Sequence, residues 1–558
     1  FMKIDINSIG YRWKGIYSPF LSYIDGDVVY RNGSVFVYRG GTLQNFALGQ
    51  QDALLAGQLL NGGVSVGGSW GQVLHSNAAS GVEFRFEAER GGTIATALMD
   101  TSNGDGANAT NHFMQTLMNE GMVRTWGRNY GGSLGTGRPD DISYNKPGRV
   151  AFPSDAPRVV SLHAAWSTVY YIMSDGSLWV TGWNSENANG LGLSADQLTP
   201  AKLSGKGDLG LNTVVTKVFS SYDYFGSLRV GCLDSNGYVY FWGTNGSGSC
   251  GWGNTTGSAV PKIVPWTITN PCKAVFPSSG QYQATMFVAL DGRAYMAGET
   301  SSTGLGGGDR YIPTRFAPWD SEAPVKKYQS SESLGHWAPG SVYRDWGVLL
   351  ENGDLYLWGD DGGQVGGGWG DGTTGDNYPG TSGYPKLCLT GVKDFVTKSG
   401  GYHTSVALMN DGTIKTTGSS GGGMNGYSVD TTTWSTIGGS YLTNVTKIRG
   451  LGGLYQGSVM ALRSDGKCVG WGLNDDGHLG IGNAVTPDWA VPSTWDFVRL
   501  NKTIVDFQLS GSCYGGVADV TVHYLCSDGS VYASGVGTYG QTGSRTDDYR
   551  YTPNQIIF

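Results

Sequence analysis

The sequence is poor in charge, and acidic residues outnumber basic ones. Charged residues make up 15% of the 558 residues, and 45 acidic against 37 basic side chains give a formal net charge of −8 at pH 7. A protein that binds duplex nucleic acid needs a basic face to displace counterions, and no run of Lys and Arg offers one. We therefore exclude nucleic acid as the main partner.

Cysteine motifs and long apolar segments are also missing. The seven cysteines are scattered, odd in number and never spaced as C-x-x-C. This pattern disfavours a disulfide framework and a structural zinc site, and it favours small buried side chains in strands. No apolar run is long enough to span a bilayer, so we expect no membrane span. The opening stretch FMKIDINSIGYRWKG also lacks the apolar core of a secretion signal.

The familiar catalytic motifs are absent too. There is no G-x-S-x-G, no H-E-x-x-H and no P-loop, and the seven histidines do not cluster with acidic residues in a known motif. Acidic loops at 100–106 and 358–377 offer the oxygen ligands that Ca²⁺ prefers, but solvated turns are the simpler interpretation. We therefore predict a non-enzymatic protein without a metal or cofactor.

Glycine and aromatic residues, in contrast, are abundant. The chain has 92 glycines, and aromatic residues make up 12% of it. One stretch, WGTNGSGSCGWG (242–253), matches the G-x-G-x-x-G fingerprint of dinucleotide-binding loops at Gly246, Gly248 and Gly251. That fingerprint needs a helix N-terminus to hold the phosphates, and no helical periodicity follows it here. These glycines therefore call for another explanation.

A period of about 60 residues supplies that explanation. Three glycines, spaced by six and then eight residues, recur eight times with no insertion between them. The first closes an N-G or D-G type turn between two apolar runs, which is a strong hairpin signal. The second and third mark places where a strand ends or the backbone packs closely. The copies lie at 121/127/135, 176/182/190, 237/243/251, 292/298/306, 353/359/367, 412/418/426, 466/472/480 and 529/535/543.

Eight such units predict an all-β fold. Each unit supplies about four short strands, because a proline with a short apolar run follows the glycines in all copies but the sixth. Radial stacking of these units predicts a β-propeller of about eight four-stranded blades, with seven blades and one displaced unit as the alternative. The last copy runs to the C-terminus, and we expect its final strand to complete the first blade and close the ring.

Two segments give the repeats a family resemblance. GGYHTSVALMNDGTIKTTG (400–418) and WGLNDDGHLGIG (471–482) resemble the repeats of the regulator-of-chromosome-condensation family. The family consensus reads roughly G-x-x-H-T-x-A-L-x-x-D-G, then W-G-x-N-x-x-G-Q-L-G-x-G. The resemblance covers about 95–558 and implies a propeller, usually of seven blades, with a structural role for His403. The family's nucleotide exchange beside chromatin is not carried over, because this acidic chain lacks the basic surface for it.

The first 95 residues follow a different pattern. Residues 13–40 read as three short strands, 43–63 allow an amphipathic helix, and 81–92 read as a strand leading into the propeller. The order W-x-G, Y, G-D-V-V-x-Y-x-G-x-x-F resembles small modules of phage tail and virion proteins and chitinase-type carbohydrate-binding modules. We therefore place a small, mostly β attachment or carbohydrate-binding-like module at 1–95 and the propeller at 96–558. The matching residues are Trp13, Tyr23, Gly26, Asp27, Val29, Tyr30, Gly33 and Phe36.

Trp13, Tyr17 and Tyr30 are the candidate ligand-binding residues of this module. Aromatic rings stack on sugars, but they equally form the core of a small β-module, and the core is the simpler interpretation for Trp13. Tyr17 and Tyr30 are better candidates for exposure, because a phenol keeps its hydroxyl in water while presenting an apolar face.

Three classes of function fit the pattern. We favour a non-enzymatic virion-associated structural or adhesion protein, a phage fibre, tail or capsid-surface component that displays the propeller for host-surface or protein binding. Its partners would be other virion proteins and a host glycan or receptor, with a homo-oligomer left open. The first alternative is a secreted protein-binding propeller such as an enzyme inhibitor. The second alternative is a glycan-cleaving tail enzyme. Insertions at 360–385 and 421–440 favour binding through loops on a rigid scaffold.

Overall fold

The computed structural model divides the chain into two compact units, Phe1–Gly92 and Thr93–Phe558. In the first unit it describes 12–16, 27–31, 34–39, 42–45, 72–77 and 83–88. From 95 onward it describes every residue except 99–112, 223–227, 279–282, 300–308, 317–318, 320–322, 335–341, 360–384, 399–402, 421–422, 427–428, 453–456, 485–495 and 515–516.

The described residues of the first unit are all in strands. β1 (Arg12–Ile16), β2 (Asp27–Arg31), β3 (Ser34–Arg39) and β4 (Thr42–Asn45) form one sheet in that order, with β1 parallel to β2. The three strands predicted over 13–40 are confirmed. The strand predicted to lead into the propeller is β6 (Glu83–Ala88), which instead pairs with β5 (Gln72–Asn77) inside this unit. Of the predicted helix, 43–45 lie in β4 and the rest falls outside the described residues.

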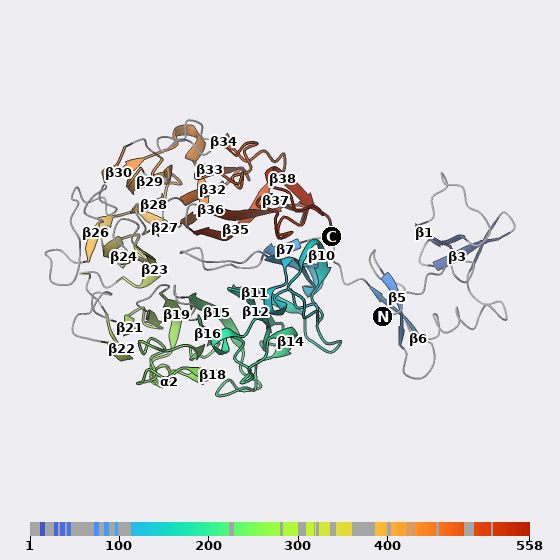
Figure 1. The fold of residues 1–558 in the computed structure, drawn as a ribbon, viewed down its shortest axis with the longest axis horizontal. Helices are drawn as coiled ribbons and strands as arrows, with labels where there is room; N and C mark the ends of the chain where they lie inside the picture. The colour runs from blue at the N-terminus through green and yellow to red at the C-terminus, as the bar shows by residue number, and fades with distance from the viewer. Residues whose placement is uncertain are drawn as a thin grey trace. The chain divides into compact units, whose positions relative to one another are not determined.

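The second unit is a ring of eight four-stranded blades, as predicted (Figure 1). Each blade takes its strands in sequence order from one repeat, and the first strands of neighbouring blades contact each other around the axis. Blades 1 to 4 comprise β7 (Ala95–Leu98), β8 (Phe113–Met118), β9 (Val123–Arg128), β10 (Ser143–Arg149); β11 (Val159–Ala165), β12 (Thr168–Met173), β13 (Leu178–Gly182), β14 (Gln197–Lys202); β15 (Val215–Tyr222), β16 (Leu228–Asp234), β17 (Val239–Gly243), β18 (Ser258–Ile263); and β19 (Cys272–Pro277), β20 (Ala284–Ala289), β21 (Ala294–Gly298), β22 (Arg310–Arg315).

The other half of the ring repeats this pattern. Blades 5 to 8 comprise β23 (Val325–Leu334), β24 (Val342–Leu350), β25 (Leu355–Gly359), β26 (Lys386–Leu389); β27 (Val392–Lys398), β28 (Thr404–Met409), β29 (Ile414–Gly418), β30 (Thr431–Thr436); β31 (Val445–Gly452), β32 (Gly457–Arg463), β33 (Cys468–Gly472), β34 (Asp496–Phe497); and β35 (Ile504–Tyr514), β36 (Val517–Cys526), β37 (Val531–Gly535), β38 (Arg550–Ile556).

Helix is scarce between these strands. Among the connecting residues that the structure describes, one short α-helix, α2 (Pro265–Thr269), joins blades 3 and 4, and single 3₁₀ turns lie at η2 (Asn119–Gly121), η3 (Tyr130–Gly132), η4 (Ser185–Asn187) and η6 (Gly439–Leu442). None of the helices in the described part of the chain is long and apolar enough to cross a membrane.

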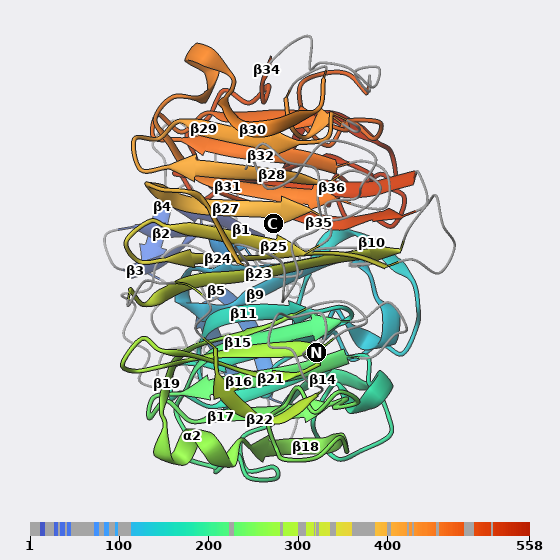
Figure 2. The ribbon, with the colours of Figure 1, turned by 90° about the vertical axis from the view of Figure 1, so that its left-hand side faces the viewer.

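The ring has two unlike faces, and in Figure 2 the strands run from one face to the other. The turn between the second and third strands is four residues long in every blade. This turn and the connections between blades lie on the same face of the ring, which we call the turn face. The connections between strands 1 and 2 and between strands 3 and 4 lie on the opposite face, which we call the long-loop face. Of the predicted insertions, 360–385 is the longest connection there, but 421–440 is not one loop, because it contains β30.

The prediction that the final strand completes the first blade is wrong. β38 pairs with β37 in its own blade. The ring closes through contacts between blades 8 and 1. The backbone N–H of Ala95 donates to Gly529 O at 2.9 Å, and Trp126 Nε1 donates to Gln541 O at 2.8 Å. The ring of Phe558 packs against Trp126 with centroids 5.9 Å apart. Because each blade is complete in itself, closure depends on the same kind of packing as every other junction.

The repeat glycines are architectural, as predicted. Gly237, Gly243 and Gly251 of blade 3 have φ values of 83°, 88° and 73°, a region that side-chain-bearing residues avoid. A Cβ atom on Gly243 would lie 2.3 Å from the carbonyl oxygen of Leu228 on the paired strand. The stretch that matched the nucleotide fingerprint is followed by β18 and not by a helix, so it lacks the helix N-terminus that binds phosphates.

The first repeat glycine also joins one blade to the next at six of the eight junctions. In blade 2 the Gly176 carbonyl accepts a hydrogen bond of 2.9 Å from the N–H of Val215, the first residue of β15. A Cβ on Gly176 would lie 2.7 Å from Val214, so the close approach itself requires glycine. The same bond, at 2.8–2.9 Å, recurs at Gly237–Cys272, Gly353–Val392, Gly412–Val445, Gly466–Ile504 and Gly529–Ala95.

Buried tryptophans add a second link at several junctions. Trp242 Nε1 donates to Ala188 O of the preceding blade at 2.7 Å, and Trp471 Nε1 donates to Met424 O at 2.9 Å. Both indoles are almost completely buried. Burying a large ring with its N–H satisfied gives the full hydrophobic gain without a desolvation penalty.

The cysteines that the structure describes are mostly small buried side chains, as their scattered positions in the sequence predicted. Five of the six are buried, Cys388 is half-buried, and none of the six forms a disulfide. Burial raises the pKa of the Cys250 thiol to about 12, which keeps it protonated at neutral pH.

We predict that Gly243→Val destabilises the propeller by about 1–3 kcal/mol, because valine must adopt a positive φ against the Leu228 carbonyl. Gly246→Val is the matched control in the same loop. No atom lies within 4 Å of a Cβ built on Gly246, so we expect a change within about 0.5 kcal/mol. Urea unfolding measures both, and equal losses would contradict the architectural role of Gly243.

Two buried histidines make the fold sensitive to acid. His523 Nε2 donates to Gln541 O at 2.9 Å, and His478 Nε2 lies 2.9 Å from Ser458 Oγ. Burial lowers the pKa of His523 from 6.5 to about 4 and that of His478 to about 3. Both rings are therefore neutral in the folded protein at pH 7 and at pH 5.

We predict that acidification from pH 7 to pH 5 lowers the free energy of unfolding by about 2 kcal/mol for each of these histidines. The unfolded ring takes up a proton below its pKa of 6.5, whereas the folded ring does so only near pH 4 or 3. The stability is thus complete above pH 6.5 and is lost as the pH falls through this window. His523→Gln keeps a donor for Gln541 O and should remove about half of the loss. Unfolding free energies that do not change between pH 7 and 5 would contradict the prediction.

Candidate functional site

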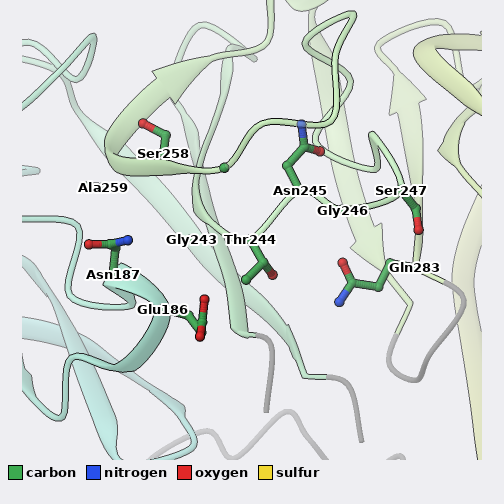
Figure 3. Close-up of a pocket in the computed structure, with 11 residues that line it drawn as sticks. Glu186, Asn187, Gly243, Thr244, Asn245, Gly246, Ser247, Ser258, Ala259 and Gln283 are labelled. Atoms are coloured by element: carbon green, nitrogen blue, oxygen red, sulfur yellow. The ribbon is translucent and has the colours of Figure 1, made fainter. Parts of the chain in front are cut away.

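A polar cavity of about 490 Å³ lies on the long-loop face where blades 2, 3 and 4 meet (Figure 3). Each of the three blades contributes to its wall through a connection on that face. The lining residues are Glu186 and Asn187 of blade 2, 243–247 and 257–259 of blade 3, and Gln283 of blade 4. The glycine stretch that resembled a nucleotide loop is therefore one wall of a cavity, although its glycines serve the fold.

An asparagine shapes the loop that forms this wall. Asn245 Oδ1 accepts from the Cys250 N–H at 2.9 Å, and Asn245 Nδ2 donates to Asn254 O at 2.8 Å. One side chain thus bridges positions five and nine residues further along and fixes the loop. The asparagine of the W-G-x-N consensus makes the same two kinds of bond in three other blades, at Asn129, Asn184 and Asn474.

The cavity offers hydrogen-bonding groups of several kinds. Figure 3 shows the Glu186 carboxylate, the Thr244 side chain and the Gln283 amide next to one another, each from a different blade. Glu186 is exposed, whereas Gln283 is only 4% exposed. Glu186 is the single carboxylate among the lining residues. A glycoside hydrolase needs a pair of carboxylates, so this cavity does not provide that chemistry.

Backbone strain concentrates in blade 2 beside the cavity. Glu186 and Asn187 have φ values of 53° and 62°, and Trp166, in the turn between β11 and β12, has a φ of 51°. These are three of the five non-glycine residues with positive φ in the described chain. Such conformations cost free energy and persist where the surrounding structure holds them, often at binding sites.

Half-buried aromatic rings form a row across blades 2, 1 and 8. The ring centroids of Trp166 and Trp183 lie 4.3 Å apart at 87°, and those of Trp183 and Tyr130 lie 5.8 Å apart. The Arg128 guanidinium lies 5.2 Å from the centroid of Tyr130 and 5.3 Å from that of Tyr539. We call these five residues the aromatic row.

An ion pair fixes the arginine of the aromatic row. Arg128 Nε and Nη2 donate to the two carboxylate oxygens of Asp141 at 2.9 and 2.7 Å. This pairing lowers the pKa of Asp141 below its ordinary value and raises that of Arg128. The two-point contact holds the guanidinium plane in one orientation, so it can support the rings on either side.

The structure does not test the aromatic residues predicted for ligand binding. Tyr17 lies outside the described residues, and of Trp13 in β1 and Tyr30 in β2 only the backbone is described. The candidate calcium loop at 100–106 and nearly all of 358–377 also lie outside them. Within the described part of the chain, no group of three or more His, Cys, Asp and Glu side chains could hold a metal ion.

Sequence reasoning missed the cavity. Glu186, Asn187 and Gln283 belong to no repeat motif, and they come together only because three blades meet. One feature of the sequence could have pointed to this region: Trp183 follows the second glycine of its repeat, whereas the tryptophan of other repeats precedes it.

Comparisons of sequence support propeller repeats of the regulator-of-chromosome-condensation type. No family model matches the chain. The chain is 26% identical to the E3 ubiquitin-protein ligase HERC2 of Homo sapiens over 378 residues, which are 65% of this chain and 7% of HERC2. It is 26% identical to the ultraviolet-B receptor UVR8 of Arabidopsis thaliana over 177 residues, which are 32% of this chain and 37% of UVR8. The chain thus spans well under half of each relative.

Similar solved structures include Prp20p from Saccharomyces cerevisiae and human WBSCR16. Prp20p aligns at a TM-score of 0.46 and 17% identity over 82% of this chain and 90% of its own. WBSCR16 aligns at a TM-score of 0.47 and 20% identity over 73% of this chain and 98% of its own.

We predict that Trp166→Gly is more stable than Trp166→Ala by about 1–2 kcal/mol, because alanine pays the left-handed strain that glycine avoids. Both variants lose the contact with Trp183 equally, so the difference between their free energies of unfolding measures the cost of the left-handed backbone at position 166. Thermal and urea unfolding of the two variants measure it. Equal stability would show that the turn relaxes to negative φ once the indole is removed.

Proposed function

We propose that this protein is a non-enzymatic recognition scaffold whose long-loop face binds a ligand. The observation that carries the proposal is the difference between the two faces of the ring. The turn between strands 2 and 3 has four residues in all eight blades, whereas the connection between strands 3 and 4 ranges from 11 to 26 residues. The cavity, the aromatic row and most of the positive-φ side chains lie on that variable face.

We further propose that the scaffold is a virion-associated component in which the first unit attaches to the particle and the propeller is displayed. The support is the resemblance of residues 13–36 to modules of phage tail and virion proteins, together with the division of the chain into two compact units. Loops held by a rigid framework suit display, because the framework keeps their conformation while their sequence changes. The presence of the chain in purified particles, measured by mass spectrometry, tests the attachment.

We predict that charge introduced on the long-loop face weakens recognition, whereas the same change on the turn face does not. Leu193 and Thr255 are exposed on long-loop connections, and Leu211 and Ile268 are exposed on the turn face. We expect Leu193→Arg with Thr255→Arg to lower binding of the fluorescent full chain to host cells at least 10-fold.

The matched control is Leu211→Arg with Ile268→Arg, since the side chains of Leu193 and Leu211 are similarly exposed, at 57% and 60%. This pair should bind as the unaltered chain does. Flow cytometry over a panel of candidate cells measures both pairs. Loss of binding confined to the turn-face pair would contradict the proposal.

A further inference from the structure

The chemistry of the polar cavity excludes several classes of ligand. Apart from the methyl group of Ala259, its side chains are carboxylate, amide and hydroxyl, with no aromatic or branched aliphatic group and no Lys or Arg among the lining residues. An apolar ligand would bury these groups without replacing their hydrogen bonds to water. A phosphate or carboxylate ligand would find the Glu186 carboxylate and no cation. A ligand rich in hydroxyls can donate and accept at each of these groups.

The cavity has a mixed donor and acceptor lining that suits such a ligand. Glu186 accepts only, whereas the amides of Asn187 and Gln283 both donate and accept. Ser258 Oγ already donates to Val260 O at 2.7 Å, and Thr244 Oγ1 to Leu228 O at 3.3 Å, so their lone pairs are oriented. A volume of about 490 Å³ lies within the usual range of small-molecule sites.

The aromatic row begins in the same loop as the cavity wall. Trp183 stands three residues before Glu186, and it contacts Trp166 and Tyr130 on the side toward blade 1. A pyranose ring has an apolar C–H face that packs against an aromatic ring while its hydroxyls point elsewhere. The loop therefore has a hydroxyl-binding side toward blade 3 and a ring-stacking side toward blade 1.

The loop that carries both sides is held in place before any ligand binds. The backbone N–H of Trp183 donates to Ser167 O at 3.0 Å, and Thr168 Oγ1 donates to the backbone carbonyl of Trp183 at 2.6 Å. The Asn184 side chain accepts from the Asn189 N–H at 3.1 Å. Fixing these groups in advance lowers the conformational entropy that binding would otherwise cost.

We infer that the polar cavity and the adjoining aromatic row form a binding site for a neutral saccharide chain, with one or more sugar residues in the cavity and others stacked along the row. This inference rests on the proposed recognition function and names its ligand class. A protein partner is the other kind of ligand for this face, but a concave wall whose one apolar side chain is Ala259 lacks the apolar anchor pocket that protein hot spots need.

The test is binding of the fluorescent full chain to an array of defined neutral and acidic oligosaccharides, followed by calorimetric titration with the neutral oligosaccharide that binds best. Glu186→Gln keeps the shape but removes the acceptor carboxylate, and Asn187→Gly removes the amide while tolerating a φ of 62°. We expect each to weaken saccharide binding at least 10-fold, and Trp166→Gly to weaken it for longer chains more than for short ones.

The matched control is Asp475→Asn, which removes an exposed carboxylate from the corresponding loop of blade 7. It should leave binding unchanged. Absence of any saccharide binding overturns the inference, and so does binding that survives the two cavity variants but is lost in Trp13→Ala. Cell binding that the long-loop pair weakens, without saccharide binding, would overturn the inference while leaving the recognition function in place.

Discussion

The propeller depends on a hydrogen bond between the glycine of a hairpin turn and the first residue of the next blade, which is present at six of the eight junctions. The Gly176 carbonyl can meet the Val215 N–H only because a turn residue without a side chain approaches Val214 closely and adopts a φ of 80°. The bond recurs through to Gly529 and Ala95, which close the ring. Six of the eight junctions use it, including the one that closes the ring, so the blades need not exchange strands.

This constraint separates the turn between strands 2 and 3, which keeps one length in all eight blades, from connections that vary. A four-residue turn that must reach the next blade tolerates neither insertion nor side chain at its glycine. The connections on the long-loop face also bond to the next blade, as the Gly192 N–H does to Ala259 O at 2.9 Å, and side chains such as Asn245 fix them locally. The connection between strands 3 and 4 nevertheless ranges from 11 to 26 residues, and loops that vary on a rigid framework are where binding sites evolve.

The repeat made most of the fold predictable from sequence, because the glycines report local backbone conformation. Ring closure was predicted wrongly, because the prediction paired the final strand with the first blade, whereas β38 pairs with β37, which precedes it in the sequence. The site was less predictable still. Its members Glu186, Thr244 and Gln283 come from three repeats, and the positive φ of Glu186 has no signature in its residue type. The aromatic candidates were sought in the first unit, whose glycine and tyrosine pattern resembled a binding module.

The aromatic row includes a tryptophan that blade 2 has at a position where no other repeat has one. In blades 1, 3, 5 and 7 a tryptophan precedes the second glycine and is buried at a junction, as Trp242 is. Blade 2 has Thr181 there, and its tryptophan follows the glycine as Trp183. Thr181 remains buried and donates from Oγ1 to Gln197 O of its own blade at 2.7 Å. The indole of Trp183, two residues further along, lies on the long-loop face and packs against Trp166. A repeat scaffold can thus gain a recognition surface by shifting one core residue past the glycine that ends its strand.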